Sequence, residues 1–405
     1  MNGSLAAHII VLVCMGSSAP PAPPARVGPR VCELADDAAS VALAARAEAA
    51  LRFMSAHGLT PAGPVPVVAV GALSGEGATD RAVSVADAAA HGLGERWAGV
   101  PALLLEAPGP GSTSEDPEAL LHELVHIWLR SRGAPEPAWA TRVSKDEPGV
   151  IIATRESGVI EEALADFITA SRSRSPVLYR ASARPGTPAR SVRGRGARCP
   201  EAFSGRPHAD ASVLSGALWD VVTRHGAEAH GILLTALAKV APSHTHEVRA
   251  LAKALTAELK RRAPKVARVW AKVVDERGLG RCQEPISLTL QRTFQSPLVQ
   301  PVIPGKRGDT PMASLQRYEV QVSGSRTLSV GVRFDGQAPP NLRWDFVDAR
   351  GRRVDASSSV LDAQTSSMAS TRLAVPPRAT RLLFRLSNPQ STPIAFDDIK
   401  VISVN

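Results

Sequence analysis

The hydrophobic periodicity of the chain changes near Ile286, and this change limits the fold more than any other feature. From that point on, short segments such as 317–324, 327–334 and 379–388 alternate apolar and polar residues between turn residues. This period of two is typical of the half-buried strands of an all-β sandwich. At 405 residues the chain also exceeds what one hydrophobic core usually holds. We therefore expect an α+β unit over residues 31–284 and a β-sandwich over 285–405.

Within residues 31–284, helix signals surround two short apolar runs. An alanine-rich segment over 36–57 ends at Gly58, which predicts a helix with a glycine stop. The runs 65–73 and 100–106 predict strands of a small sheet. Asp116-Pro117-Glu118 has the N-cap, first-position proline and first-turn acid of a helix, which we expect to reach Gly133. Further helices are expected over residues 157–171, 211–225, 228–240, 247–262 and 266–276.

Residues 1–18 have the features of an export signal. Residues 5–15 form an apolar run too short to span a bilayer, and small residues before Ala19 would allow cleavage there. The proline-rich stretch 19–30 predicts an extended linker. Cys14 leaves a lipid anchor open as the alternative, although Val13 stands where lipid attachment normally requires a small residue. We expect a secreted protein without a transmembrane segment.

Removal of this leader would leave three cysteines, Cys32, Cys199 and Cys282, and hence one disulfide and one free thiol. We favour a Cys199–Cys282 bond, because it would join the end of a long loop to the end of the helical region. Spacing alone leaves the pairing open. No cysteine lies in a C-x-x-C motif, so nothing supports a thiolate zinc site.

The net charge of +9 and the pI near 9.9 permit acidic partners. Eight arginines and no acidic residue lie from Arg172 to Arg198, with Tyr179 as the one aromatic residue. Without stacking side chains this segment would be a poor nucleic-acid platform. We expect a solvated surface loop here and no nucleic-acid partner.

The segment HELVH carries the strongest chemical signal. On a helix, residues four apart share a face, so His122 and His126 would direct two imidazoles at one ion with Glu123 beside them. Bound Zn²⁺ acts as a Lewis acid and lowers the pKa of its water, and a carboxylate is then needed to carry the water's proton to the leaving amine. We predict the two histidines as zinc ligands and Glu123 as the general base. Chance would give this pattern in about one such chain in a hundred.

A catalytic zinc also needs a third protein ligand and an open position for water. Glu162 and Asp166 lie four residues apart, on one face of the helix expected over 157–171. We expect Glu162 to bind the metal and Asp166 to accept the free N–H of a ligating histidine. The alternative is a solvent-facing acidic stripe.

HELVH and GVIEEALADF together resemble the thermolysin-type zinc peptidases, the gluzincins. The resemblance covers roughly residues 100–225 and implies a zincin-type metallopeptidase domain with Zn²⁺ as cofactor and the five residues above in their stated roles. His208 ahead of Gly216-Ala217-Leu218-Trp219 is similar to the fungalysin relatives, which implies oxyanion stabilisation by His208. A polar loop histidine is the alternative. Tyr179 is the one candidate for a second oxyanion donor.

The chain departs from the family in two respects: a longer stretch separates HELVH from the third ligand, and the segment that holds the substrate backbone is missing. We expect a secreted zinc endopeptidase acting on proteins or peptides. The alternative is a zinc-binding but inactive surface adhesion or binding protein. Residues 395–399 resemble the last strand of jelly-roll modules on secreted hydrolases, which implies a glycan or cell-surface contact. Only Trp344 and Tyr318 are large aromatics with a polar handle there, so packing is their default role.

Overall fold

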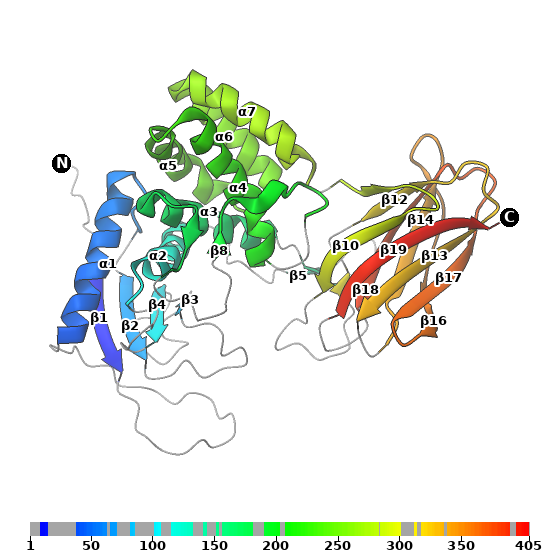
Figure 1. The fold of residues 1–405 in the computed structure, drawn as a ribbon, viewed down its shortest axis with the longest axis horizontal. Coiled ribbons are helices and arrows are strands. Elements are labelled where there is room, and N and C mark those ends of the chain that lie inside the picture. Colours follow the sequence, from blue (N-terminus) through cyan, green and yellow to red (C-terminus); the bar gives the residue numbers. More distant parts are fainter. Residues whose placement is uncertain are drawn as a thin grey trace, which may run out of the picture. The chain divides into compact units, whose positions relative to one another are not determined.

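The computed structural model of the chain describes residues 9–14, 38–62, 65–70, 82–85, 101–106, 115–132, 141–143, 151–153, 156–180, 190–202, 207–282, 284–300, 312–313, 317–335, 338–388 and 394–404. Contacts divide the chain into two compact units. The first gathers residues 1–136, 160–195 and 214–273, and the second gathers 137–159, 196–213 and 274–405. Helices dominate the first unit and strands the second, so the chain is an α+β protein, as expected (Figure 1).

The first unit contains a four-stranded sheet in the order β1-β2-β4-β3. Its strands are β1 (Ile9–Cys14), β2 (Val65–Val70), β3 (Ala82–Val85) and β4 (Ala102–Glu106). The pairs β1–β2 and β2–β4 are parallel, whereas β3 is antiparallel to β4. The two strands expected over 65–73 and 100–106 are therefore present. The apolar run expected to be an export signal supplies β1, and its cleavage stays a prediction.

Two helices pack together beside this sheet, α1 (Ala38–Ala56) and α2 (Pro117–Ser131). The chain leaves α1 through Gly58, whose φ of +80° lies in the left-handed region that glycine adopts at little cost. The predicted glycine stop is therefore confirmed.

The start of α2 also follows the prediction. The Asp116 side chain accepts hydrogen bonds from the backbone N–H groups of Glu118 and Ala119. With one exception, Glu123, the residues from Ala119 to Leu129 are buried, so α2 is a core helix. Its histidines consequently lie where little water reaches them.

The remaining helices among the described residues are α3 (Glu156–Ser173), α4 (Pro207–His225), α5 (Ala229–Val240), α6 (Val248–Arg262) and α7 (Pro264–Arg277), with 3-10 turns at Gly194–Gly196, Ala241–Ser243 and Leu279–Arg281. α4 begins four residues before the expected position 211, because Pro207 occupies the first helical position, where proline is favoured. A short antiparallel ladder joins β7 (Val177–Leu178) to β8 (Arg190–Ser191).

The second unit contains two sheets. The first has the order β10-β19-β13-β17-β16 and consists of β10 (Thr293–Gln300), β13 (Thr327–Asp335), β16 (Asp362–Thr365), β17 (Met368–Ala374) and β19 (Ile394–Val404). The second has the order β15-β14-β18-β11-β6-β5, and β12 pairs with both β18 and β9. Its strands are β5 (Thr141–Val143), β6 (Ile151–Ala153), β9 (Ile286–Leu288), β11 (Met312–Ala313), β12 (Tyr318–Gln321), β14 (Asn341–Val347), β15 (Arg353–Val360) and β18 (Arg381–Asn388).

One hydrophobic core joins the two sheets. It includes Phe334 and Phe396 from the first sheet and Tyr318, Phe346 and Phe384 from the second. Tyr318 is fully buried, and Trp344 packs against the same core, so both aromatics have the packing role given as their default.

The second unit also draws on segments that the sequence had placed in the first domain. β6 pairs in parallel with β11, which adds the β5–β6 pair to the edge of the second sheet. The predicted Cys199–Cys282 disulfide is present and lies within this unit. The expected limit at residues 284 and 285 therefore falls inside the second unit.

Among the strands that escaped prediction, β15 did so because its sequence does not alternate. β15, with the sequence RVDASSSV, pairs with β14 but is exposed along nearly its whole length. Since neither face is covered by the core, no periodicity marks it. None of the helices in the described ranges has the length and hydropathy needed to cross a bilayer.

Candidate metal centre

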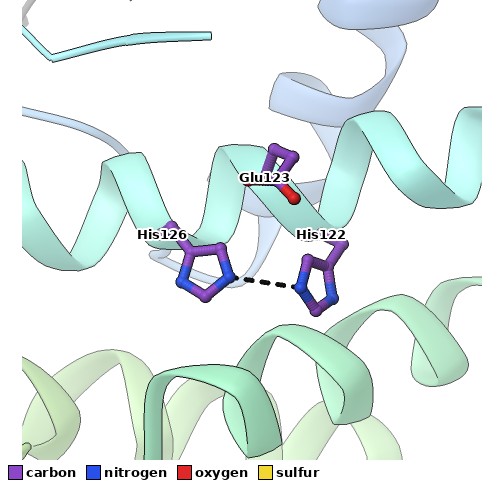
Figure 2. A group of neighbouring side chains, drawn as sticks. All are labelled: His122, Glu123 and His126. Atoms are coloured by element: carbon purple, nitrogen blue, oxygen red, sulfur yellow. Dashed lines mark hydrogen bonds between the residues drawn. The ribbon is translucent and has the colours of Figure 1, made fainter. Parts of the chain in front are cut away.

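The two histidines of HELVH face the same side of α2. Their Nε2 atoms lie 3.2 Å apart, and both side chains are almost fully buried. Figure 2 shows the two rings projecting from α2 toward a neighbouring helix, with the dashed line joining the facing nitrogens. Together with Glu123 they offer ligand atoms within 4.8 Å of one another, so the group is able to hold a metal ion.

Glu162, on α3, places its carboxylate next to both Nε2 atoms. Its Oε2 lies 3.2 Å from His122 Nε2, and its Oε1 lies 3.5 Å from His126 Nε2. Ligands bound to zinc at about 2.0–2.1 Å in a tetrahedron lie about 3.3 Å from one another. The distance between the two Nε2 atoms, and the distance from each of them to the nearer oxygen of Glu162, are close to that length.

The hydrogen bonding behind the rings tests whether a cation fits. Each Nδ1 has an oxygen within hydrogen-bond distance, so each ring can place its proton there and leave a lone pair on Nε2. Two such lone pairs directed at each other across 3.2 Å repel, unless a cation or a proton lies between them. This donor set of two imidazoles and one carboxylate is one that zinc accepts.

Tyr179 and Asp166 both lie behind His122. The Tyr179 hydroxyl is 2.6 Å from His122 Nδ1, whereas Asp166 Oδ1 is 3.3 Å from the same atom. Asp166 Oδ1 is buried and makes no hydrogen bond within the described part of the chain, so the nearer Tyr179 oxygen takes the ring's N–H. Asp166 therefore lies where we expected it, but a tyrosine accompanies it. In this arrangement Tyr179 supports a ligand and is not placed as an oxyanion donor.

The β7–β8 ladder positions two side chains near His122 and Asp166, because Tyr179 directly follows β7 and Arg190 begins β8. Tyr179 has a φ of +59°, a region that costs a non-glycine residue energy, and its backbone N–H donates to Glu118 Oε2. Arg190 lies 2.8 Å from Asp166 Oδ2 and 3.4 Å from Glu162 Oε2. The expectation that the arginine-rich segment is wholly solvated is therefore wrong at Arg190, since the buried carboxylates attract its guanidinium.

These contacts shift the pKa values of the cluster. Burial alone would lower the pKa of His122, but the adjacent carboxylates of Asp166 and Glu162 outweigh it and raise that pKa to about 10. Burial, and then the charge of Asp166, raises the pKa of Tyr179, which keeps its hydroxyl protonated. Burial opposes the charge of Arg190, but Asp166 and other neighbours raise its pKa overall. The cluster therefore stabilises positive charge strongly.

Behind His126 lies a carboxylate that the sequence analysis did not assign. Glu161 Oε2 is 3.4 Å from His126 Nδ1, and the Glu161 side chain is 1% exposed. Arg130 lies on the other side of it, 4.0 Å from the same oxygen. The only signal in the sequence was the doubled glutamate at 161 and 162, which does not say which carboxylate faces which ring.

The structure describes the side chain of one of the two predicted catalytic residues, Glu123, but not that of the other, His208. Glu123 is partly buried on α2, within the group that can hold a metal ion. His208 is the second residue of α4, and its side chain is outside what the structure describes. Its predicted role in oxyanion stabilisation stays a prediction.

Comparisons with known proteins do not assign the chain to a family. No protein-family model matches the chain, and no curated protein matches it. Among solved structures, the pre-peptidase C-terminal domain of collagenase from Bacillus anthracis is similar at 10% identity and a TM-score of 0.20, over 30% of this chain and 97% of that one.

Two further structures are equally distant. The K3 cleaved adhesin domain of Lys-gingipain from Porphyromonas gingivalis gives 18% identity and a TM-score of 0.17, over 25% of this chain and 69% of that chain. The active domain of bacteriophage CBA120 tailspike protein 4 gives 15% identity and a TM-score of 0.19, and this chain spans only 13% of its length. Scores this low carry no argument about fold or function.

Proposed function

We propose that the chain is a zinc-dependent endopeptidase. The observation that carries the proposal is the convergence of His122 Nε2, His126 Nε2 and the Glu162 carboxylate. The two nitrogens lie 3.2 Å apart, and they lie 3.2 Å and 3.5 Å from the two oxygens of that carboxylate, Oε2 and Oε1. A second support is the carboxylate of Glu123, which lies beside the two histidines. The resemblance of HELVH and GVIEEALADF to the gluzincins favours peptide bonds over other substrates.

In this proposal the chain's own groups divide the work. When bound, Zn²⁺ would supply a Lewis acid and make a water molecule acidic enough to attack at neutral pH. Glu123 would take the proton of the attacking water and give it to the leaving amine. His122, His126 and Glu162 would hold the metal, and Tyr179 and Asp166 would keep the His122 lone pair directed at it.

The location and the role of the second unit belong to the same proposal. We infer that the enzyme is exported and meets its protein or peptide substrates outside the cell. The disulfide between Cys199 and Cys282 is compatible with an oxidising compartment. A glycan or cell-surface contact through the β-sandwich is the partner we favour for that unit.

The test combines metal content with cleavage. Purified wild-type protein should hold about one zinc ion per chain and cleave casein or a peptide library. Glu123→Gln should keep the zinc and lose the cleavage, because the amide cannot accept a proton. His122→Ala and Glu162→Ala should lose the zinc.

Each contrary result has its own meaning. If wild type holds zinc but cleaves nothing, the chain is a metal-binding protein of the adhesion type. If zinc content survives both His122→Ala and Glu162→Ala, the ligand assignment is wrong. Equal cleavage by wild type and Glu123→Gln would exclude Glu123 as the base.

A further inference from the structure

Glu161 is the most deeply buried carboxylate near the metal centre, and the chemistry proposed above does not use it. Its side chain is 1% exposed, and its Oε2 faces His126 Nδ1 at 3.4 Å. Its other oxygen, Oε1, is also buried and has no hydrogen-bond partner among the residues that the structure describes. A carboxylate in such surroundings is costly unless it has a strong partner.

Two cationic or hydrogen-donating groups are placed to be that partner, and both belong to α2. His126 and Arg130 are four residues apart and so share a face of that helix. The Arg130 guanidinium lies 4.0 Å from the Oε2 that faces the ring, and its side chain is 14% exposed. The closer of the two contacts is therefore the one to the imidazole.

The neighbouring residue on α3 meets the same imidazole at its other nitrogen. Glu162 Oε1 lies 3.5 Å from His126 Nε2, while Glu161 Oε2 lies 3.4 Å from His126 Nδ1. A hydrogen bond from Nδ1–H to Glu161 fixes the rotation of the ring and its tautomer, and it leaves Nε2 free to share the metal with Glu162. With the proton on Nδ1, the Nε2 lone pair points toward His122 Nε2, and hence toward the proposed metal position between the two nitrogens.

We propose that Glu161 is a positioning residue for His126: it accepts the Nδ1–H and thereby holds Nε2 as a metal ligand. The inference rests on the proposed metal centre and deepens it. The two imidazoles would then be supported by different groups, His122 by Tyr179 with Asp166, and His126 by Glu161 with Arg130. Outer groups of this kind change metal affinity by about 10- to 100-fold when removed.

The simpler role for Glu161 is a structural ion pair with Arg130. That role predicts a loss of stability and no change in metal affinity. It also predicts that a neutral amide is as harmful as an apolar side chain, because neither carries charge. The positioning role predicts the opposite for the amide, whose oxygen still accepts a hydrogen bond.

Glu161→Leu and Glu161→Gln in the full-length chain separate the two roles. We would measure zinc affinity by competition with a chromophoric chelator, the visible spectrum of the Co²⁺-loaded protein, and thermal unfolding of the metal-free protein. We expect Glu161→Leu to weaken zinc binding by about 10- to 100-fold and to change the Co²⁺ spectrum. Glu161→Gln should recover most of the affinity.

Glu258→Leu is the matched control. Glu258 is another buried carboxylate in the first unit, and it pairs with Arg261 and Arg262. Its loss should lower the stability of the metal-free protein and leave zinc affinity unchanged.

Three results would overturn the inference. Zinc affinity in Glu161→Leu equal to that of wild type would do so, as would Glu161→Gln binding no better than Glu161→Leu. No zinc binding by wild type would overturn the inference and the proposed metal centre together. If wild type binds zinc without cleaving peptides, only the peptidase proposal fails, and the affinities of the Glu161 variants still decide the role of Glu161.

Discussion

Acid should loosen the packing of α3, the helix that supplies the third metal ligand, by protonating a histidine behind it. His230 on α5 is 4% exposed, and its Nδ1 lies 3.0 Å from Ser171 Oγ on α3. Its ring stacks on Phe167 of the same helix, with 6.3 Å between centroids, and meets Trp219 edge-on. A positive charge on this ring would be largely shielded from water, so protonation of the folded protein is unfavourable.

The size of the effect follows from the pKa of His230. Burial, and then the positive charge of Arg174, lowers that pKa from 6.5 to about 4. Between these two values the unfolded chain binds more protons than the native one, so the free energy of unfolding falls as pH falls. This contribution is complete above about pH 6.5 and lost by about pH 4. At about pH 5 the full shift corresponds to a loss of about 2 kcal/mol, and partial screening by solvent reduces it to about 1 kcal/mol.

The assay is urea unfolding followed by far-UV circular dichroism, at about pH 7.5 and about pH 5, for wild type, His230→Gln and His230→Phe. Both variants remove the titration, so both should lose less stability on acidification than wild type does. Their stabilities at the higher pH should differ, because only glutamine can still bond to Ser171. Equal losses in all three proteins would refute the assignment of the acid sensitivity to His230.

Three other predictions concern the metal centre and the disulfide. Tyr179→Phe removes the oxygen 2.6 Å from His122 Nδ1 and should weaken zinc binding by about 10-fold in a competition titration, while unchanged affinity would leave Asp166 as the sole support of that ring. Arg190→Met removes the guanidinium that lies 2.8 Å from Asp166. It should lower the free energy of unfolding of the metal-free protein by about 3 kcal/mol, with a smaller loss once zinc is bound. An equal loss in both states would contradict the role of Arg190 in balancing the charge of the centre. Replacing Cys199 and Cys282 together by serine opens a loop of 83 residues and should cost at most about 4.5 kcal/mol in the second unit, measured by denaturant unfolding, whereas an unchanged midpoint would show that the bond adds no stability.

Local sequence signals predicted the elements that carry the centre. The Asp116 cap and Pro117 predict the start of α2, and the spacing of four then places His122 and His126 on one face. The same spacing brings Glu162 and Asp166 to His122. These features depend on helix geometry within a few residues, which is why the sequence contains them.

The other members of the centre depend on contacts between distant segments. Arg190 reaches the carboxylates because β8 pairs with β7, and nothing within the arginine-rich segment distinguishes it from its neighbours. Tyr179 is directed at His122 by a left-handed backbone conformation and by the bond from its N–H to Glu118. No sequence periodicity indicates either the strand pairing that positions Arg190 or the backbone conformation of Tyr179. The choice between Glu161 and Glu162 depends in turn on how α3 rotates against α2.

The formal charges around the two imidazoles give a last argument for a divalent ion. Four carboxylates and two guanidinium groups gather there, namely Glu123, Glu161, Glu162, Asp166, Arg130 and Arg190. With neutral imidazoles this set has a net charge of minus two. A proton on His122 neutralises half of it, whereas one divalent cation at the Nε2 atoms neutralises it fully. Net charge is costly in a site from which water is largely excluded, so the metal-free state should be the less stable one. Removing the Arg190 charge adds one negative charge in either state, and that charge costs more where two are already unneutralised, which is why its cost should shrink when zinc is added.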